Sequence, residues 1–368
     1  MKKDPFKEYI IESNPTKKEL GYSWYTAIGL QKVDGLETSD YLKRVAIDNI
    51  EGDISFEKAE ELIRSYYIEN EDHSSLTEEA DKVSINIAKI LSEKTFNFSP
   101  AQYLEIHRRL FSNVFDHAGE IRTYNITKKE WVLDGDTVLY GSASSLNETL
   151  EYDFNVEKSF DYSKLNTNEF IHHMARFIAD LWQIHVFPEG NTRTTAVFFI
   201  KYLRTLGFDA TNDIFAEHAW YFRNALVRAN YTDLKNGVHE TTEYLELFLK
   251  NLLLNEKNEL HNRTMHVSGK FNNLQKADIG EEKADIGEEK TDIAIKIANI
   301  DEAINSKTRS NILALYQHCG KETFFGRTVV ESVTGLKSTR ASEVLQLLLR
   351  NNIIEKVQGH GKGKYRFL

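Results

Sequence analysis

Apolar residues recur at helical spacing along most of this 368-residue chain, which contains only four prolines. A proline inside a helix removes a hydrogen bond and its ring clashes with the preceding turn, so the scarcity of proline leaves long helices intact. Apolar positions three or four residues apart are typical of helices that bury one face. The sequence therefore predicts a mainly α-helical protein.

The composition is that of an ordinary globular protein, with 41% hydrophobic and 28% charged residues, and the length allows two or three domains. No run of apolar residues approaches the roughly 18 that a membrane span needs. The N-terminal stretch lacks the apolar core of a signal peptide. Cys319 is the only cysteine, which excludes an internal disulfide and favours a reducing compartment. We therefore expect a cytoplasmic protein without a membrane partner.

Changes of pattern divide the chain into four segments, of which residues 1–95 are expected to form a helical region and residues 96–260 a helical domain. Residues 261–305 contain the seven-residue repeat "KADIGEE", which has one isoleucine per unit. A coiled coil needs two apolar positions per heptad, so we interpret this segment as a solvated linker. The alternative is a short dimerising helix, and hence a homodimer.

The fourth segment, residues 306–368, has the order of a winged helix-turn-helix: three short helices, an apolar pair and a glycine-rich turn. The helices are expected at about 309–317, 325–333 and 338–350. The net charge of −10 argues against nucleic-acid binding by the whole chain, but one basic domain could still bind DNA. Lys337, Arg340 and Lys362 are the candidate contacts to DNA phosphates. Because a fold does not fix a function, a protein-binding module of the same shape is the alternative.

Within residues 96–260, Ser99 and Pro100 are predicted to start a helix, as N-cap and first-turn residue. The stretch "YNITKKEWVLDGDTVLYGSAS" follows, rich in β-branched and aromatic residues, with Asp134-Gly135 at its centre. Such a dipeptide between two β-prone runs is a hairpin signal. We therefore predict a β-hairpin inserted among the helices.

The stretch "HVFPEGNTRTTA", residues 185–196, combines a base with a helix start. A histidine has an ordinary pKa near 6.5, so His185 suits the removal of a proton from a hydroxyl. Gly190 lets the backbone approach a ligand closely, and Asn191 can fix the turn or donate to an oxygen. A helix that begins here offers free N–H groups and the positive end of its dipole to a phosphate.

Two charged side chains complete this chemistry. Arg193 carries a fork of donors that matches phosphate geometry. Glu189 would repel phosphates unless a divalent cation lies between them, and Mg²⁺ is commonly held by one carboxylate together with phosphate oxygens. The residues therefore predict phosphoryl or nucleotidyl transfer from a nucleotide.

This pattern resembles the motif of the Fic (Fido) domain family, His-x-Phe-x-Asp/Glu-Gly-Asn-x-Arg-x-x-Arg. The likeness extends over residues 96–260, including "IHRRLF…AGEIR" before the predicted hairpin and "YFRNALVRAN" after the motif. Six positions in order match the motif, which makes the resemblance specific. They are His185, Phe187, Glu189, Gly190, Asn191 and Arg193.

The resemblance implies a protein adenylyltransferase, in which a histidine deprotonates a Ser, Thr or Tyr hydroxyl of a target protein. AMP is transferred from ATP to that hydroxyl, and pyrophosphate leaves. By position, His185 is the base and Phe187 a buried anchor of the loop. Glu189 holds Mg²⁺, and Arg193 grips the β- and γ-phosphates. The other nucleotide-binding positions that the resemblance implies are Gly190, Asn191, Thr192 and Asn230.

The predicted hairpin resembles the family's flap, which holds a target peptide by strand addition, so that specificity depends partly on main-chain hydrogen bonds. The flap positions implied in target binding are Ile126, Thr127, Lys128 and Lys129. The implied fold is a helical Fic core with this flap, an N-terminal helical region and a C-terminal winged helix.

Two positions depart from the family pattern. Val186 stands where many members have proline, and Ala196 occupies the second arginine position. The lost charged hydrogen bond is worth roughly 1.5–3 kcal/mol, so activity is expected to be weakened or redirected. The alternatives are a Fic enzyme that uses another nucleotide or removes AMP, and a transcriptional regulator whose weakened site only senses nucleotide.

Many members also carry an inhibitory helix, Ser/Thr-x-x-x-Glu-Gly/Asn, whose glutamate hinders placement of the γ-phosphate. Here Glu51-Gly52 matches its end, with Ile47 in place of Ser or Thr. We expect Glu51 to be the inhibitory residue, with Arg193 as its partner in place of the missing arginine. The alternative is a helix end whose acid faces solvent.

Overall fold

The computed structural model describes residues 5–367 except residues 12, 70–73, 209, 211–212, 269–305, 321–322, 352 and 358–363. The predicted linker repeat and the wing tip with Lys362 lie outside the described residues. The chain divides into two compact units, residues 1–274 and 275–368. Among the helices that the structure describes, none has both the length and the apolar character required to cross a membrane.

The first unit begins with α1 (Phe6–Ile10), α2 (Pro15–Leu30), α3 (Asp40–Glu51), α4 (Phe56–Glu69) and α5 (Ser75–Ser92), and the short 3-10 turn η1 (Gln31–Asp34) follows α2 directly. The Ser39 side chain caps α3 by accepting from the Leu42 N–H at 3.0 Å. Helix α3 ends because Gly52 adopts a left-handed conformation, with φ 89°, which glycine reaches without steric cost.

The helices that follow are α6 (Pro100–Leu110), α7 (Leu146–Lys158), α8 (Thr167–Ile184), α9 (Asn191–Thr205), α10 (Ile214–Glu217), α11 (Ala219–Ala229) and α12 (Glu243–Leu254). The 3-10 turns among them are η2 (Trp131–Leu133), η3 (Tyr162–Lys164), η4 (Leu234–Asn236) and η5 (Asn262–Met265). The predicted start of α6 is confirmed, because Ser99 Oγ accepts from the Gln102 N–H at 3.2 Å and Pro100 is the first helical residue.

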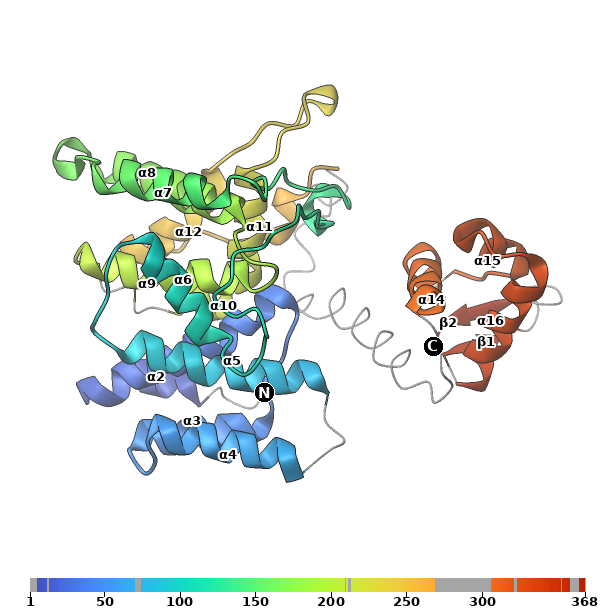
Figure 1. The fold of residues 1–368 in the computed structure, drawn as a ribbon, viewed down its shortest axis with the longest axis horizontal. Coiled ribbons are helices and arrows are strands. Elements are labelled where there is room, and N and C mark those ends of the chain that lie inside the picture. Colours follow the sequence, from blue (N-terminus) through green and yellow to red (C-terminus); the bar gives the residue numbers. More distant parts are fainter. Residues whose placement is uncertain are drawn as a thin grey trace. The chain divides into compact units, whose positions relative to one another are not determined.

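One apolar core joins the N-terminal helices to those that follow residue 96. Helix α9 lies at its centre, between α5 and α6 on one side and α8 on another (Figure 1). Residues 191–203 of α9 are buried on every face. Its polar side chains therefore need internal partners, and Thr195 shares a hydrogen bond of 2.8 Å with Tyr103 of α6. This packing fixes the start of α9 in space.

The segment of residues 121–142 turns back at Asp134-Gly135 as predicted, but its two arms do not pair as β-strands. The turn is η2, closed by a bond of 3.0 Å from the Gly135 N–H to Glu130 O. In a β-hairpin, the backbone carbonyls of one arm would accept hydrogen bonds from the other arm. Here a side chain of another element occupies such a carbonyl, because Gln183 of α8 donates to Leu139 O at 3.0 Å. The prediction of a β-hairpin is wrong in this respect, and the segment is an extended loop, which we call the flap.

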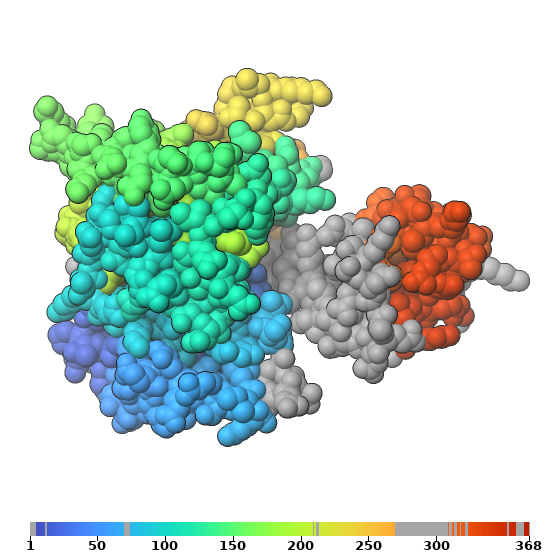
Figure 2. Space-filling view, viewed as in Figure 1, coloured from blue at the N-terminus to red at the C-terminus, as the bar shows by residue number. Residues whose placement is uncertain are grey.

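The loop between α11 and α12 carries η4 and projects from the surface of this unit (Figure 2, yellow). Tyr231 at its base donates from its hydroxyl to Asp136 Oδ2 in the flap at 2.7 Å. The turn of the flap is therefore held from a second side.

The second unit contains α14 (Ser306–Cys319), α15 (Arg327–Thr334), α16 (Ser338–Arg350), β1 (Ile354–Lys356) and β2 (Tyr365–Phe367). The strands pair antiparallel, with Ile354 opposite Phe367, and Phe325 forms an additional bridge to Tyr365. A separate apolar core, which includes Leu315, Val344 and Phe367, holds these elements together. The order of helices and strands is the predicted one, and α16 has the predicted bounds.

Candidate active site

His185 follows the last residue of α8 in a left-handed conformation, with φ 52°. Its ring is 4% exposed and lies between Tyr140, at 4.3 Å between ring centroids, and Trp182, at 5.2 Å. Nδ1 lies 3.3 Å from Trp182 O. Because a carbonyl only accepts, the neutral ring carries its proton on Nδ1, which leaves the lone pair of Nε2 for a hydroxyl.

Burial lowers the pKa of His185 well below its ordinary value, and the positive charge of Lys128 lowers it further. The imidazole is therefore neutral at physiological pH. A neutral imidazole with one free nitrogen is the form that accepts a proton.

Arg122 anchors the end of α8 to both arms of the flap. Its guanidinium donates to His185 O at 2.7 Å, to Tyr124 O at 2.6 Å and to Gly141 O at 2.5 Å. The side chain is buried, and its bond to His185 O lies out of water and fixes the backbone of the histidine, whereas the other two bonds are partly buried. Sequence reasoning assigned no role to Arg122, although it ends the quoted "AGEIR".

The loop after His185 is closed by its own asparagine. Asn191 accepts from the Phe187 N–H at 3.0 Å through Oδ1 and donates to Phe187 O at 2.7 Å through Nδ2. Phe187 is fully buried, as predicted for the loop anchor. The side chain of Asn191 therefore fixes the turn, and only its backbone remains to face a ligand.

Gly190 is the N-cap of α9, with φ 76°, and a Cβ there would lie 2.3 Å from the Phe111 ring. Having no side chain, it caps none of the first N–H groups of α9, which therefore remain able to bind an anion. The Thr192 hydroxyl accepts from Trp182 Nε1 at 3.0 Å, so this predicted nucleotide-binding side chain ties α9 to α8.

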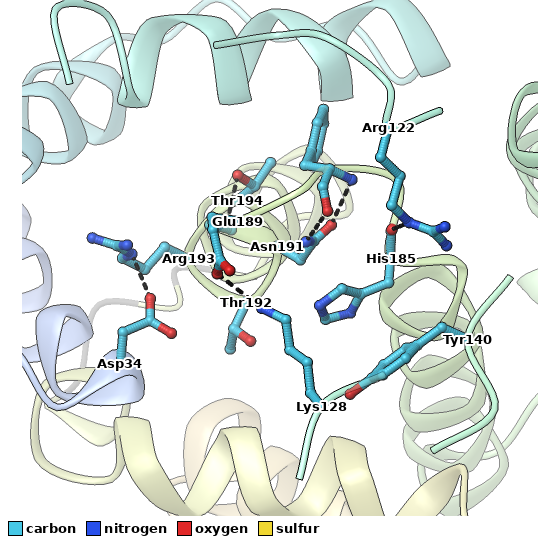
Figure 3. A network of polar contacts seen from close by, with 12 residues as sticks. Asp34, Arg122, Lys128, Tyr140, His185, Glu189, Asn191, Thr192, Arg193 and Thr194 are labelled. Atoms are coloured by element: carbon cyan, nitrogen blue, oxygen red, sulfur yellow. Dashed lines mark hydrogen bonds and ion pairs between the residues drawn. The ribbon is translucent and has the colours of Figure 1, made fainter. Parts of the chain in front are cut away.

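Glu189 lies at the mouth of the site with a side chain that is 58% exposed, and its Oε2 lies 2.8 Å from Lys128 Nζ (Figure 3). No group of three or more histidine, cysteine or carboxylate side chains suited to a metal ion occurs among the described residues. One exposed carboxylate fits Mg²⁺ only when phosphate oxygens and water supply the other ligands, which is the usual arrangement for nucleotide-bound Mg²⁺.

Arg193 is buried in a cage of polar side chains that sequence reasoning did not predict. Its Nε forms an ion pair with Asp34 Oδ2 at 2.8 Å, and its Nη2 donates to Glu79 Oε1 at 2.7 Å. Nη1 donates to Gln31 Oε1 at 3.0 Å, and the guanidinium lies 4.8 Å from the Phe111 ring centroid. Nη1 and Nη2 of the guanidinium thus donate to η1 and α5, whereas Nε lies close to the Asp34 carboxylate without a hydrogen-bond partner among the described residues.

Glu51 does not contact Arg193, which corrects the expectation that these two residues pair. Its Oε2 lies 2.5 Å from Lys17 Nζ, and its Oε1 accepts from the Tyr9 hydroxyl at 2.6 Å. These two bonds lower the pKa of the Glu51 carboxyl. The reason is topological: α3 ends against α1 and α2, whereas η1 and α5 lie against the start of α9. Glu79 and Asp34 occupy the place predicted for Glu51.

The other predicted residues are spread over the flap and α11. Lys128 points to Glu189, whereas Thr127 and Lys129 are exposed and Ile126 packs partly against the core. The Asn230 amide donates to Ala179 O at 2.9 Å and to Leu226 O at 3.0 Å, tying α11 to α8. A role of Asn230 toward a nucleotide stays a prediction.

The last predicted position, Ala196, is fully buried in α9, so an arginine there would have to enter the core.

Residues 97–203 match the sequence model of the Fic/DOC family. Among solved structures, the N-terminal FIC domain of Bep8, a VirB-translocated Bartonella effector protein from Bartonella sp. 1-1C, is similar with 18% identity and a TM-score of 0.37, covering 50% of this chain and 88% of that chain. A Fic family protein from Desulfovibrio desulfuricans G20 has 12% identity and a TM-score of 0.41, covering 98% and 90%. No curated protein matches the chain. The chain thus carries a Fic/DOC family domain.

Proposed function

We propose that this Fic domain is a protein adenylyltransferase, which moves AMP from ATP to a hydroxyl side chain of a target protein. The observation that carries the proposal is the position of His185. A neutral imidazole with a free Nε2 lies directly before a helix start whose first N–H groups have no side-chain cap. A base for a hydroxyl and a cradle for a phosphate are thus five residues apart, within the segment that matches the Fic/DOC model.

The reaction follows from these groups. The target hydroxyl gives its proton to Nε2 of His185 while its oxygen attacks the α-phosphorus of ATP. The bond between the α-phosphorus and the bridging oxygen breaks, and pyrophosphate leaves with the electron pair. The N–H groups at the start of α9 stabilise the charge that develops on the phosphate oxygens. Glu189 would hold Mg²⁺, which neutralises charge on the phosphates; Lys128 must then release the carboxylate.

We further propose that Asp34 and Glu79, rather than Glu51, restrain the site. Their carboxylates neutralise the arginine that is expected to bind the β- and γ-phosphates. A triphosphate must displace them before the leaving group is held. This replaces the inhibitory role expected of Glu51, on the observation that Glu51 is paired elsewhere.

The test is transfer of label from ATP to the protein itself and to candidate targets. Label at the α-phosphate should be incorporated and label at the γ-phosphate should not, since only AMP is transferred. His185→Ala should lower incorporation by about 10²- to 10⁴-fold while ATP affinity stays nearly unchanged. His172→Ala, an exposed histidine on the same helix, is the matched control and should keep full activity. Incorporation from the γ-phosphate, or full activity of His185→Ala, would reject the proposal.

A second function, DNA binding, is favoured for the C-terminal unit by its charge. Residues 306–368 contain 11 lysines and arginines and 4 acidic residues, whereas the whole chain contains 46 and 56. The basic residues are therefore concentrated in one part of an acidic protein. Lys337 and Arg340 are exposed at the start of α16, the third helix before the two strands. A helix in this place enters the major groove in helix-turn-helix proteins.

Fluorescence anisotropy of the full chain with a labelled DNA duplex tests this function. Affinity should fall steeply as salt rises, and Lys337→Ala should reduce the slope by about one. No binding at low salt, or capture of a protein partner that Lys337→Ala leaves intact, would favour a protein-binding module. Binding that depends on ATP, without label transfer, would favour a nucleotide-sensing regulator.

A further inference from the structure

His107 of α6 is a fully buried histidine that touches the loop of the proposed active site from behind. Its ring lies parallel to the Phe187 ring, with 3.7 Å between centroids and 8° between planes. Its Nε2 lies 3.0 Å from Glu189 O, and its Nδ1 lies 2.8 Å from the Gly119 N–H. One imidazole thus joins α6, the turn that precedes the flap and the loop that precedes α9.

The two hydrogen bonds of His107 fix its tautomer. The Gly119 N–H can only donate, so Nδ1 is the acceptor, and the Glu189 carbonyl can only accept, so Nε2 carries the proton. Burial lowers the pKa of His107 to about 3, although the bond to Glu189 O opposes this shift. The ring therefore stays neutral at all ordinary pH values and does not exchange protons with a substrate.

The bond to Glu189 O determines the direction of the next amide. A peptide unit is planar and trans, so its C=O and N–H point in opposite directions. The carbonyl of Glu189 points into the core toward His107, and the N–H of Gly190 consequently points out of the core. No partner accepts this N–H within the described part of the chain. It is the first of the N–H groups at the start of α9.

A second ring, from the residue directly after α6, prevents this loop from moving toward the helix. Phe111, one helical turn after His107, would meet a Cβ at Gly190 at 2.3 Å. The loop cannot retreat toward α6, and it cannot turn its peptide without losing the bond to His107. The pair shows how "IHRRLF" contacts the loop of a motif that is far from it in the sequence.

We infer that His107 is a positioning residue, which holds the Glu189–Gly190 peptide with its N–H toward the phosphate site. The inference rests on the proposed function for the identity of the ligand, but the orientation of the peptide can be measured without any nucleotide. His107 acts through the backbone and touches neither the nucleotide nor the target.

Three substitutions separate the parts of the ring. The Nε2 of glutamine is three bonds from Cβ, as in histidine, so His107→Gln keeps the donor to Glu189 O. The Oδ1 of asparagine is two bonds from Cβ, as is Nδ1, so His107→Asn keeps only the acceptor for Gly119. His107→Phe keeps the stacking on Phe187 and neither bond. Tyr103→Phe is the control, because it removes a buried hydrogen bond from α6 to Thr195 and keeps the ring that packs against Phe187.

The first readout is the affinity for AMP relative to adenosine, by calorimetry. His107→Asn and His107→Phe should lower this ratio by about tenfold or more, as expected for one lost hydrogen bond to a charged group. His107→Gln and Tyr103→Phe should retain it, and adenosine affinity should be unchanged throughout. A wild-type ratio in His107→Asn and His107→Phe would overturn the inference. An equal loss of the ratio in His107→Gln would also overturn it, because the effect would then come from the packing of the ring and not from its bond to Glu189 O.

The second readout is the residual dipolar coupling of the Gly190 N–H, measured without nucleotide in glycine-labelled protein. The coupling should be the same in wild type and His107→Gln, and changed or averaged in His107→Phe, whose ring still fills the core. An unchanged coupling in His107→Phe would contradict the inference even if transfer is confirmed. A changed coupling in a protein that shows no preference for AMP would instead reject the proposed function and leave the positioning role standing.

Discussion

The two ends of the segment from His185 to Arg193 have opposite surroundings. At the first end, Arg122 holds the backbone of the histidine, and burial keeps its imidazole neutral. At the other end, Asp34 and Glu79 hold the arginine. Figure 3 shows the histidine on one side of α9 and Arg193 with Asp34 on the other, with Lys128 reaching between them.

Under the proposed function, this difference indicates which end of the segment must rearrange when ATP binds. The base needs no rearrangement before it accepts a proton, whereas the arginine must exchange two carboxylates for phosphates. The residues of the first end lie in the Fic domain itself, but those that restrain the second end lie on η1 and α5. In the proposed reaction, the N-terminal helices therefore act on binding of the leaving group and not on the chemistry of the hydroxyl.

The largest effect on ATP affinity is expected from removing the carboxylates that restrain Arg193. The double substitution Asp34→Asn and Glu79→Gln should tighten ATP binding by about 10- to 100-fold, because phosphates no longer compete with two carboxylates. Calorimetry with ATP measures this change. Glu78→Gln is the matched control, since Glu78 pairs with Lys82 and not with Arg193. An unchanged ATP affinity in the double variant would mean that Arg193 binds no phosphate, and the comparison of the two ends would fail.

The same double variant should be less stable without nucleotide, because it leaves a buried guanidinium without its negative partners. Adding ATP should restore the melting temperature more than it raises that of the wild type. Calorimetric melting with and without ATP gives both values. Equal increments in the two proteins would contradict an exchange of carboxylates for phosphates.

A smaller effect, on the Mg²⁺ requirement of transfer, is expected from a substitution of Glu189 at the mouth of the site. Glu189→Gln keeps the shape of the side chain but loses the charge for Mg²⁺, so transfer should need about tenfold more Mg²⁺. A titration of the initial rate with MgCl₂ measures the requirement. An unchanged titration would make Glu189 merely the partner of Lys128 at the start of the helix.

The pH dependence tests the first end. A base acts only when deprotonated, and its depressed pKa should keep transfer constant from pH 8 to well below 6.5. Lys128→Ala removes the largest of the positive charges that lower this pKa, so the acid limb of the rate should move upward and activity at pH 5.5 should fall several-fold. Lys129→Ala, its exposed neighbour, is the control. A limb that does not move would show that Lys128 does not act on the histidine.

The smallest effect is expected from Glu51→Gln. Its partners are Lys17 and Tyr9, in an exposed setting, so ATP affinity and label transfer should change less than about twofold. A clear gain of activity in this variant would restore Glu51 as the inhibitory residue and would require α3 to move toward α9.

The sequence allowed the motif to be predicted because its residues are contiguous and each has its own chemistry. The helix start at Asn191, the buried Phe187 and the cap at Ser99 depend on neighbours within a few positions, which a sequence pattern contains. The partners of Arg193 lie more than 100 residues away, and no local pattern relates them.

The flap shows a second limit of sequence reasoning. Its β-prone residues and its turn predicted paired strands. Instead, the side chains of Arg122 and Gln183 donate hydrogen bonds to backbone carbonyls of the flap. Strand propensity describes the fit of residues to a pleated surface and cannot anticipate competition from distant side chains. The turn at Asp134-Gly135 was predictable because the residues that close it are near neighbours in the sequence.

The measurement that tests the difference between the two ends most directly is a crystal structure of the full chain with Mg²⁺ and a non-hydrolysable ATP analogue. The account predicts the α-phosphate on the first N–H groups of α9 within reach of His185 Nε2. It also predicts Arg193 on the β- and γ-phosphates, released from Asp34 and Glu79. A bound analogue that leaves Arg193 paired with both carboxylates, or an α-phosphate away from His185, would contradict it.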